Sequence, residues 1–213
     1  MTFVYGSLVK ALLALRSRGI TGLRLSLRDR LDPQVYRLYV RGLGAGDRMW
    51  VDDSHVAIHP GDVGALRVWR TANPDLPLTF HRDVTDGWTN FLWAGAAGKP
   101  IGIVWIVENP PFVRLAGAER AISDLYTAPA LRRNGIGAAL VSAACQQMQS
   151  AQVARAYATV HESNVGSYRL FESLGFHVLG TRVVQGFASF RRRPADWRAP
   201  QTQAPSTPQH SRP

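Results

Sequence analysis

Two arginines and two glycines stand where the chain changes from a strand-like to a helix-like pattern. Arg132, Arg133, Gly135 and Gly137 lead into a helix predicted over residues 135–150. Glycine lets the backbone approach a ligand closely, and the first turn of a helix presents unpaired N–H groups that favour an anion. The segment lacks the Lys-Ser/Thr of a P-loop and the third glycine of a dinucleotide fingerprint. It predicts a phosphate cradle, although an ordinary strand-to-helix turn also fits the glycine pair.

A second pattern follows further along the chain, in a helix predicted over residues 164–174. Asn164, Ser167 and Leu170 are followed by Gly175 and Phe176. This order resembles the Asn-x-x-Ala-x-x-Leu-Tyr-x-x-x-Gly-Phe pattern of the GCN5-related N-acetyltransferase (GNAT) family, with Ser in place of Ala. Two ordered motifs are more specific than either one alone.

The loop that leads into the helix predicted over residues 135–150 carries the same resemblance. Leu125–Pro129 followed by Arg132–Gly137 is similar to the family's Arg/Gln-x-x-Gly-x-Gly acetyl-CoA loop, and Val56–Val63 is similar to its first strand and helix. The resemblance covers about residues 53–191. It implies an α/β (α+β) fold with a mixed, mostly antiparallel sheet flanked by helices.

The resemblance also implies how acetyl-CoA would be held. Thr127 backbone groups would pair with the pantetheine arm, the Leu125 amide would polarise the thioester carbonyl, and Asn164 would contact the cosubstrate. A gap between the strands ending at Thr127 and His161 would admit the thioester. The implied pyrophosphate-binding residues are Arg132, Arg133, Asn134, Gly135, Ile136, Gly137 and Ala138.

Direct attack by an amine requires that the amine lose a proton. An alkyl ammonium has a pKa of about 10.4 and is almost entirely charged at neutral pH. Asp124, on the candidate cofactor strand, is the first choice for the base, with Glu108 and His161 as second choices near the expected gap. A solvated or ion-paired strand carboxylate is the alternative reading of Asp124.

The sequence departs from the family at the group that would protonate the leaving thiolate. Phe171 stands where the family often has tyrosine, and it has no hydroxyl. Tyr168 lies three residues earlier on nearly the same helix face, so we expect its phenol to reach the same region. A packing tyrosine, with the thiolate leaving through solvent, is the alternative.

Periodicity outlines the elements that must position these groups. Strands are predicted near residues 55–59, 90–95, 101–107, 118–127, 155–160, 176–181 and 187–191, with a helix beginning at Asp62. Residues 75–86 read as acceptor-contacting loops without a pattern that selects an acceptor. Aromatic residues on the strands either line an acceptor cleft or, more simply, form core: Phe80, Trp88, Phe91, Trp93 and Trp105.

The two ends of the chain differ in composition from the body. Residues 1–48 carry nine Lys or Arg against three Asp and read as a basic extension, an amphipathic helix plus an accessory pair of strands around Leu23–Leu27 and Tyr36–Val40. The helix could pack on a protein surface or lie on an anionic membrane. Residues 49–193 are the expected GNAT-like domain, and the proline-rich tail 194–213 is expected to be disordered.

Composition excludes several other classes. A single cysteine, Cys145, rules out a disulfide scaffold and a cysteine-based metal site, so we expect buried packing for Cys145, no metal cofactor and a reducing, cytoplasmic location. His55, His59 and His81 lack ligand spacing. The net charge of +10 alone suggests nucleic acid, but no basic-aromatic motif accompanies it. The sequence thus predicts an acetyl-CoA-dependent N-acetyltransferase acting on an amine-bearing acceptor, with a non-catalytic acetyl-CoA-binding regulatory module as the alternative.

Overall fold

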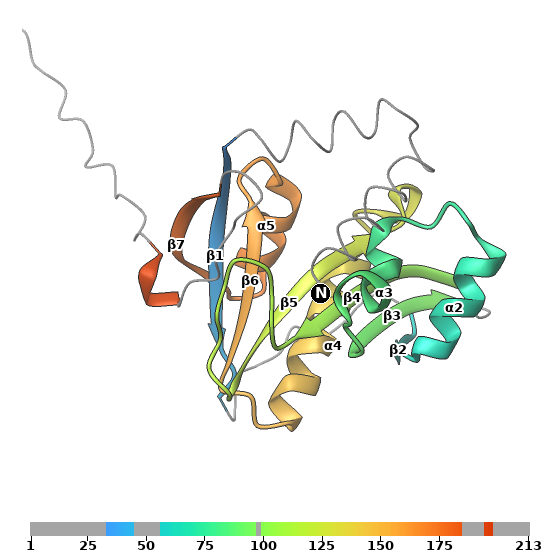
Figure 1. Ribbon diagram of the computed structural model, residues 1–213, viewed down its shortest axis with the longest axis horizontal. Coiled ribbons are helices and arrows are strands. Elements are labelled where there is room, and N and C mark those ends of the chain that lie inside the picture. Colours follow the sequence, from blue (N-terminus) through green and yellow to red (C-terminus); the bar gives the residue numbers. More distant parts are fainter. Residues whose placement is uncertain (1–32, 45–55, 97–98, 185–193, 198–213) are drawn as a thin grey trace, which may run out of the picture.

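The computed structural model describes residues 33–44, 56–96, 99–184 and 194–197 (Figure 1). These residues form seven strands, four α-helices and three short 3-10 helices. In chain order the elements are β1 (Gln34–Gly42), β2 (Ile58–Pro60), α2 (Val63–Ala72), η1 (Leu78–His81), α3 (Arg82–Asp86), β3 (Phe91–Ala96), β4 (Lys99–Val107), β5 (Glu119–Thr127), η2 (Pro129–Leu131), α4 (Ile136–Ser150), β6 (Arg155–His161), α5 (Val165–Ser173), β7 (His177–Val184) and η3 (Pro194–Asp196).

One sheet joins all seven strands in the order β2-β3-β4-β5-β6-β1-β7. Every neighbouring pair is antiparallel except β5 and β6, which run parallel because α4 connects them as a crossover. The predicted mixed, mostly antiparallel sheet with helices on its faces is therefore confirmed.

The place of β1 corrects the expected accessory strand pair. β1 lies between β6 and β7, with Leu38 opposite Thr159 on one side and Gly180 on the other. Leu38 and Tyr39 are fully buried. Residues 34–42 thus form an internal strand of the seven-stranded sheet. The alternation of apolar residues identified the strand, but alternation carries no information about its partners. The expected N-terminal helix and the Leu23–Leu27 strand lie outside the described residues.

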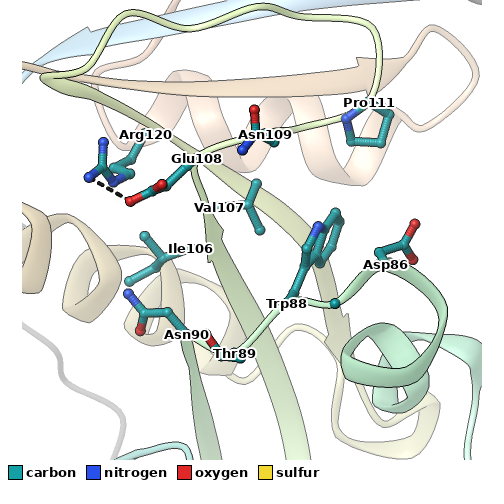
Figure 2. A pocket seen from close by; sticks show the side chains of 11 residues that line it. Asp86, Trp88, Thr89, Asn90, Ile106, Val107, Glu108, Asn109, Pro111 and Arg120 are labelled. Carbon is teal, nitrogen blue, oxygen red and sulfur yellow. Dashed lines mark ion pairs between the residues drawn. The ribbon is translucent and has the colours of Figure 1, made fainter. Parts of the chain in front are cut away.

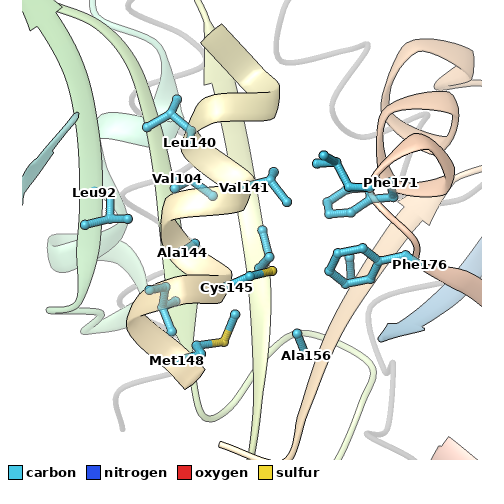
Figure 3. Close-up of a cluster of buried hydrophobic side chains, with 14 of the residues drawn as sticks. Leu92, Val104, Leu140, Val141, Ala144, Cys145, Met148, Ala156, Phe171 and Phe176 are labelled. Atoms are coloured by element: carbon cyan, nitrogen blue, oxygen red, sulfur yellow. The ribbon is translucent and has the colours of Figure 1, made fainter. Parts of the chain in front are cut away.

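Two cores fill the two faces of the sheet, because successive side chains of a strand point in opposite directions. The α4-side core joins Leu92 and Val104 of the sheet to α4 and α5, and Figure 3 shows Phe171 and Phe176 facing Cys145 and Val141. The α2-side core contains Leu66, Phe80, Phe91, Ile103, Trp105, Tyr157 and Trp197. Phe80, Phe91 and Trp105 are fully buried, which confirms the core reading for these three; Trp88 and Trp93 are half-buried.

Cys145 packs inside the α4-side core as predicted. Its side chain is fully buried, and burial raises the pKa of the thiol to about 12. The thiol is therefore protonated at neutral pH and takes the part of a small apolar side chain.

The helix start at Asp62 is also confirmed, whereas η1 and α3 were missed. Asp62 accepts hydrogen bonds from the N–H groups of Gly64 and Ala65 at 3.0 and 3.1 Å. Residues 78–86, expected as loop, form η1 and α3 over the sheet face opposite α4. Elements of four and five residues are too short to show the helical period.

The start of the tail is ordered, which corrects the expectation for residues 194–213. Pro194–Asp196 form η3, and the Trp197 side chain is only 5% exposed in the α2-side core. One large indole offers enough apolar area to anchor a short segment that its proline-rich surroundings would otherwise leave solvated. Residues 198–213 lie outside the described residues.

Candidate functional site

The predicted phosphate cradle is an uncapped helix start. Gly135 is the N-cap of α4 with φ 78°, and Arg133 also has a left-handed backbone with φ 68°. No described side chain caps this helix, and the first intrahelical bond runs from Ala139 N–H to Gly135 O at 2.9 Å. The N–H groups of the first turn are therefore open to an anion, which the positive end of the helix dipole also favours.

Gly137 brings this helix start close to two other elements. A Cβ at Gly137 would lie 3.4 Å from Leu170 Cδ2 of α5, 3.7 Å from Leu125 Cδ2 and 3.8 Å from Thr127 Oγ1 of β5. The glycine thus keeps open the space where β5, α4 and α5 converge.

β5 and β6 separate next to the cradle. Their parallel pairing runs from Glu119 opposite Arg155 to Ile122 opposite Ala158, and the remaining residues of both strands are unpaired with each other. β5 ends at Thr127 and β6 at His161, the two strand ends between which a gap was expected. From residue 123 onward, no described strand pairs with the β6-facing edge of β5, so within the described structure this edge is open to another extended chain.

A β-bulge lies where the gap opens. Ile103 pairs with Tyr126 and Trp105 pairs with Ser123, so two residues of β5, Asp124 and Leu125, stand opposite one residue of β4. Asp124 adopts a left-handed backbone with φ 46°. Bulges re-aim the side chains and amides of a strand, and here they do so beside the free edge of β5.

The Asp124 carboxylate forms an ion pair with Arg82, the first residue of α3. The two side chains are 25% and 17% exposed. Burial alone would lower the pKa of Arg82, but the Asp124 and Asp86 carboxylates outweigh it, and the pKa is raised. The contact joins Arg82 Nε to Asp124 Oδ2, which leaves Asp124 Oδ1 without a partner among the described residues.

Two predicted cosubstrate contacts are engaged in local bonds. Arg132 is exposed, and its Nε donates to the Thr127 carbonyl at 3.3 Å. Asn164 is the N-cap of α5, where its Oδ1 accepts from Ser167 N–H at 3.2 Å. Arg132 therefore lies beside the end of β5, and the cap leaves the Asn164 amide nitrogen as the group that could reach a ligand.

Tyr168 and Phe171 both face β1. The Arg37 guanidinium lies 5.0 Å from the centre of the Tyr168 ring, and Phe171 stacks on Tyr39 with the ring centres 6.2 Å apart. Phe171 is 4% exposed and belongs to the core, whereas Tyr168 is half-buried. The strand β1 thus supplies the surroundings of the tyrosine expected to act as the acid.

His161 lies at the β6 end of the gap, but Glu108 does not lie at the gap. The Ser163 N–H can only donate, so His161 Nδ1 accepts it at 3.2 Å, and Nε2 is left to donate to Gln34 Oε1 at 2.6 Å. Glu108 pairs at 2.8 Å with Arg120, which belongs to the part of β5 that is paired with β6. The expectation for Glu108 was wrong because the hairpin places the end of β4 beside the start of β5.

Glu108 and Arg120 instead border a polar cavity of about 320 Å³ (Figure 2). The cavity lies between the segment after α3 and the end of β4, and Trp88 and Asn90 form part of its wall. Its mixture of one ion pair, amide groups and an indole suits a small polar ligand.

Sequence reasoning missed Arg82 and the surroundings of His161. Tyr36 of β1 packs edge-on against His161 with ring centres 5.3 Å apart, and Phe112 lies 4.9 Å from Tyr36 on the other side. The i,i+4 pair of Arg82 and Asp86 at 2.9 Å was the one local signal of a helix there.

In the part of the chain described, no group of three His, Cys, Asp or Glu could hold a metal ion, and no helix is long and apolar enough to cross a membrane.

Solved structures are similar to this chain in fold, at low sequence identity. A Drosophila protein matches with a TM-score of 0.52 and 14% identity over 75% of this chain and 54% of that one. The glucosamine N-acetyltransferase region of a fungal multi-domain β-N-acetylglucosaminidase matches with a TM-score of 0.50 and 11% identity over 76% and 22%. A GCN5-related N-acetyltransferase from Sphaerobacter thermophilus gives 0.49 and 16% over 82% and 60%. This chain spans less than two thirds of the length of each of these structures.

The match to a family model defines the class of this domain as acetyltransferase-type. Residues 53–176 match the model of the acetyltransferase (GNAT) family, which is more than half of the chain, and the protein belongs to this family. No curated protein matches the sequence. The family supports a role in acyl transfer.

Proposed function

We propose that this protein transfers an acetyl group from acetyl-CoA to an amine. The observation that carries the proposal is the uncapped start of α4, with Gly137 turned toward the free edge of β5. An anion cradle and an unpaired strand edge side by side match the two parts of CoA, a pyrophosphate and an arm with two amide groups. The residues present therefore fit this cosubstrate.

The cosubstrate would be held by backbone groups more than by side chains. The N–H groups of residues 135–138 would bind the pyrophosphate, with Arg132 and Arg133 adding charge, and Thr127 would pair with the pantetheine arm. Asn134 and Ile136 belong to the same turn, and Asn164 would contact the arm from α5. The Leu125 N–H, in the bulge, would polarise the thioester carbonyl.

In the proposed reaction the amine nitrogen forms a bond to the carbonyl carbon and the carbon–sulfur bond breaks. Asp124 is the proposed base, because its free Oδ1 can accept the proton that the amine gives up. Tyr168 is the proposed acid, which would return a proton to the thiolate. Phe171 is buried and has no hydroxyl, so it cannot act as the acid in place of Tyr168.

The cosubstrate assignment is tested by thermal-shift titration of the full chain with acetyl-CoA. The added methyl of Gly137→Ala stands at ordinary contact distances, so the variant should fold, and alanine favours a helix over glycine by up to about 1 kcal/mol. We expect its acetyl-CoA affinity to fall at least about tenfold, or ~1.4 kcal/mol. Gly166→Ala, in the first turn of α5, is the matched control and should bind as the wild type does. Equal binding by all three proteins would contradict the assignment.

Turnover is tested by release of free CoA thiol over a panel of amines. Asp124→Asn keeps the shape of the side chain but removes the base, and we expect kcat to fall about 100-fold or more. Tyr168→Phe removes only the hydroxyl and should lower kcat less than Asp124→Asn does. Binding of acetyl-CoA without any thiol release by the wild type would instead identify the regulatory module.

A further inference from the structure

We propose that Arg82 is a positioning residue for the acyl transfer: through Asp124 it holds the bulge of β5 that carries the Leu125 N–H and the free Asp124 Oδ1. The inference rests on the proposed function. It assigns a role to α3, which is remote from both sequence motifs.

The bulge needs an external support. Asp124 is a non-glycine residue in the left-handed region, and such a backbone costs about 1 to 3 kcal/mol unless its surroundings enforce it. The bulge also removes regular pairing between β4 and β5 at this point. Among the described residues, Arg82 is the one partner of the Asp124 side chain, and the contact is largely shielded from solvent. An ion pair in such a place is stronger than one in water.

Arg82 is itself held by two further contacts. Its Nη1 lies 2.9 Å from Asp86 Oδ2, and its guanidinium carbon lies 5.5 Å from the centre of the Trp88 ring. Thr85 donates to the same Asp86 oxygen at 2.6 Å. Gly87, with φ 70°, ends α3 and turns the chain so that Trp88 returns toward Arg82. Contacts with Asp86 and Trp88 therefore fix the guanidinium, and its Nε contacts Asp124 in the bulge.

The geometry requires arginine. One guanidinium nitrogen contacts Asp124 and another contacts Asp86, while the flat face is turned to the indole. A lysine ammonium is a single point charge on a flexible stem and cannot satisfy three separated partners in fixed directions. Arg82→Lys should thus keep the charge but release the bulge.

The test compares Arg82→Lys with Arg70→Lys in the full-length protein. Arg70 of α2 forms a more deeply buried ion pair with Asp83 at 2.5 Å, so it anchors α3 but does not contact the bulge. We expect Arg82→Lys to lower kcat about 10- to 100-fold, since small misplacements of reacting groups have effects of this size. Its acetyl-CoA dissociation constant should stay within about threefold of the wild type, because the cradle is untouched. Arg70→Lys should retain nearly all of the wild-type kcat.

The double variant Arg82→Lys/Asp124→Asn separates positioning from a general structural effect. If Arg82 acts through Asp124, the second substitution adds little to the loss already caused by Asp124→Asn. Fully multiplicative losses, or an unchanged kcat in Arg82→Lys, would overturn the proposal. An equal fall of kcat in Arg70→Lys would also overturn it, by showing that the docking of α3 alone is responsible.

Amide hydrogen exchange of residues 123–127 gives a readout that does not depend on turnover. Exchange in this segment should rise in Arg82→Lys and not in Arg70→Lys. If the wild type releases no thiol with any amine, the proposed function fails, while the exchange comparison still decides whether Arg82 holds the bulge. Unchanged exchange in Arg82→Lys would contradict the inference that Arg82 holds the bulge of β5.

Discussion

The two longest helices of the described structure begin in opposite ways. α2 starts at Asp62, whose carboxylate binds two N–H groups of the first turn, and Leu66 is its only buried residue. α4 starts at Gly135 without a side-chain cap, and eight of its 15 residues are buried. In α2, a side chain at the helix start pairs N–H groups of the first turn, whereas in α4 the corresponding N–H groups are left to solvent or a ligand.

The difference shows which interactions hold each helix. Short helices are marginal alone, and most of their stability comes from packing. The buried residues of α4 run from Ile136 to Met148 and pack in the core between the sheet and the helix, so α4 can dispense with a cap that would occupy the proposed anion site. α2 has one narrow buried face and keeps the cap. An open helix start inside a strongly packed helix is therefore a better indicator of a binding site than an open start alone.

Removing packing from α4 should have the largest effect on stability. Leu140 is fully buried in the α4-side core, and Leu140→Ala should lower the free energy of unfolding by about 2 to 5 kcal/mol. Denaturant unfolding followed by circular dichroism measures this loss. A loss below about 1 kcal/mol would show that packing does not carry α4.

Closing the α4 terminus should have the next largest effect, on ligand binding. Gly135→Asp places a carboxylate where the pyrophosphate is expected, and we predict a loss of acetyl-CoA affinity of about 100-fold, or ~2.7 kcal/mol. Isothermal titration calorimetry measures it. Gly135→Asn, which tolerates the left-handed backbone without the charge, is the matched control and should lose much less. Equal losses in the two variants would assign the effect to the backbone and not to charge.

Opening the α2 terminus should cost less. Asp62→Ala removes both capping bonds, and we expect the free energy of unfolding to fall by about 1 kcal/mol. Asp62→Asn retains an acceptor and should recover most of the loss. Thermal unfolding of the three proteins decides this, and acetyl-CoA affinity should not change in any of them.

The smallest effect concerns pH and the buried thiol of α4. Burial raises the pKa of Cys145 from 9.0 to about 12, so the folded state keeps its proton where the unfolded state loses it. The thiol's contribution to stability is complete well below pH 9 and declines as the pH rises through 9 toward 12. At pH 9 the decline is about 0.4 kcal/mol, half of the unfolded thiols being ionised. Cys145→Ala should flatten the alkaline decline measured by urea unfolding, and an unchanged slope would contradict the assignment.

Local patterns predicted the central part of the molecule well. The cap at Asp62, the strands before and after α4, and the glycine loop are each encoded within about ten neighbouring residues. The same holds for the burial of Cys145, which follows from its position between apolar residues one helical turn away. The family resemblance rests on these segments, and so the proposed cosubstrate contacts could be stated from the sequence.

Contacts between distant segments could not be predicted in the same way. β1 was visible as a strand, yet nothing in Tyr36–Val40 indicates that β6 and β7 are its partners. Arg82 and Asp124 belong to segments whose only link is spatial, and α3 is too short to have a readable period. The prediction for residues 194–213 followed the proline-rich composition of the whole segment and so missed the burial of Trp197.

The position of β1 has a consequence for the order of folding. β1 ends at Gly42, but its partners begin only at Arg155 and His177, more than 110 residues later. During synthesis this strand must wait for nearly the whole domain, and closing so large a loop is slow. The β2–β5 half of the sheet, with α2 and α3, can form from contacts that are closer in sequence. The β6-β1-β7 half, which borders the gap and surrounds Tyr168 and His161, should therefore be the last to assemble, so that the site is completed only when the earliest strand meets the latest.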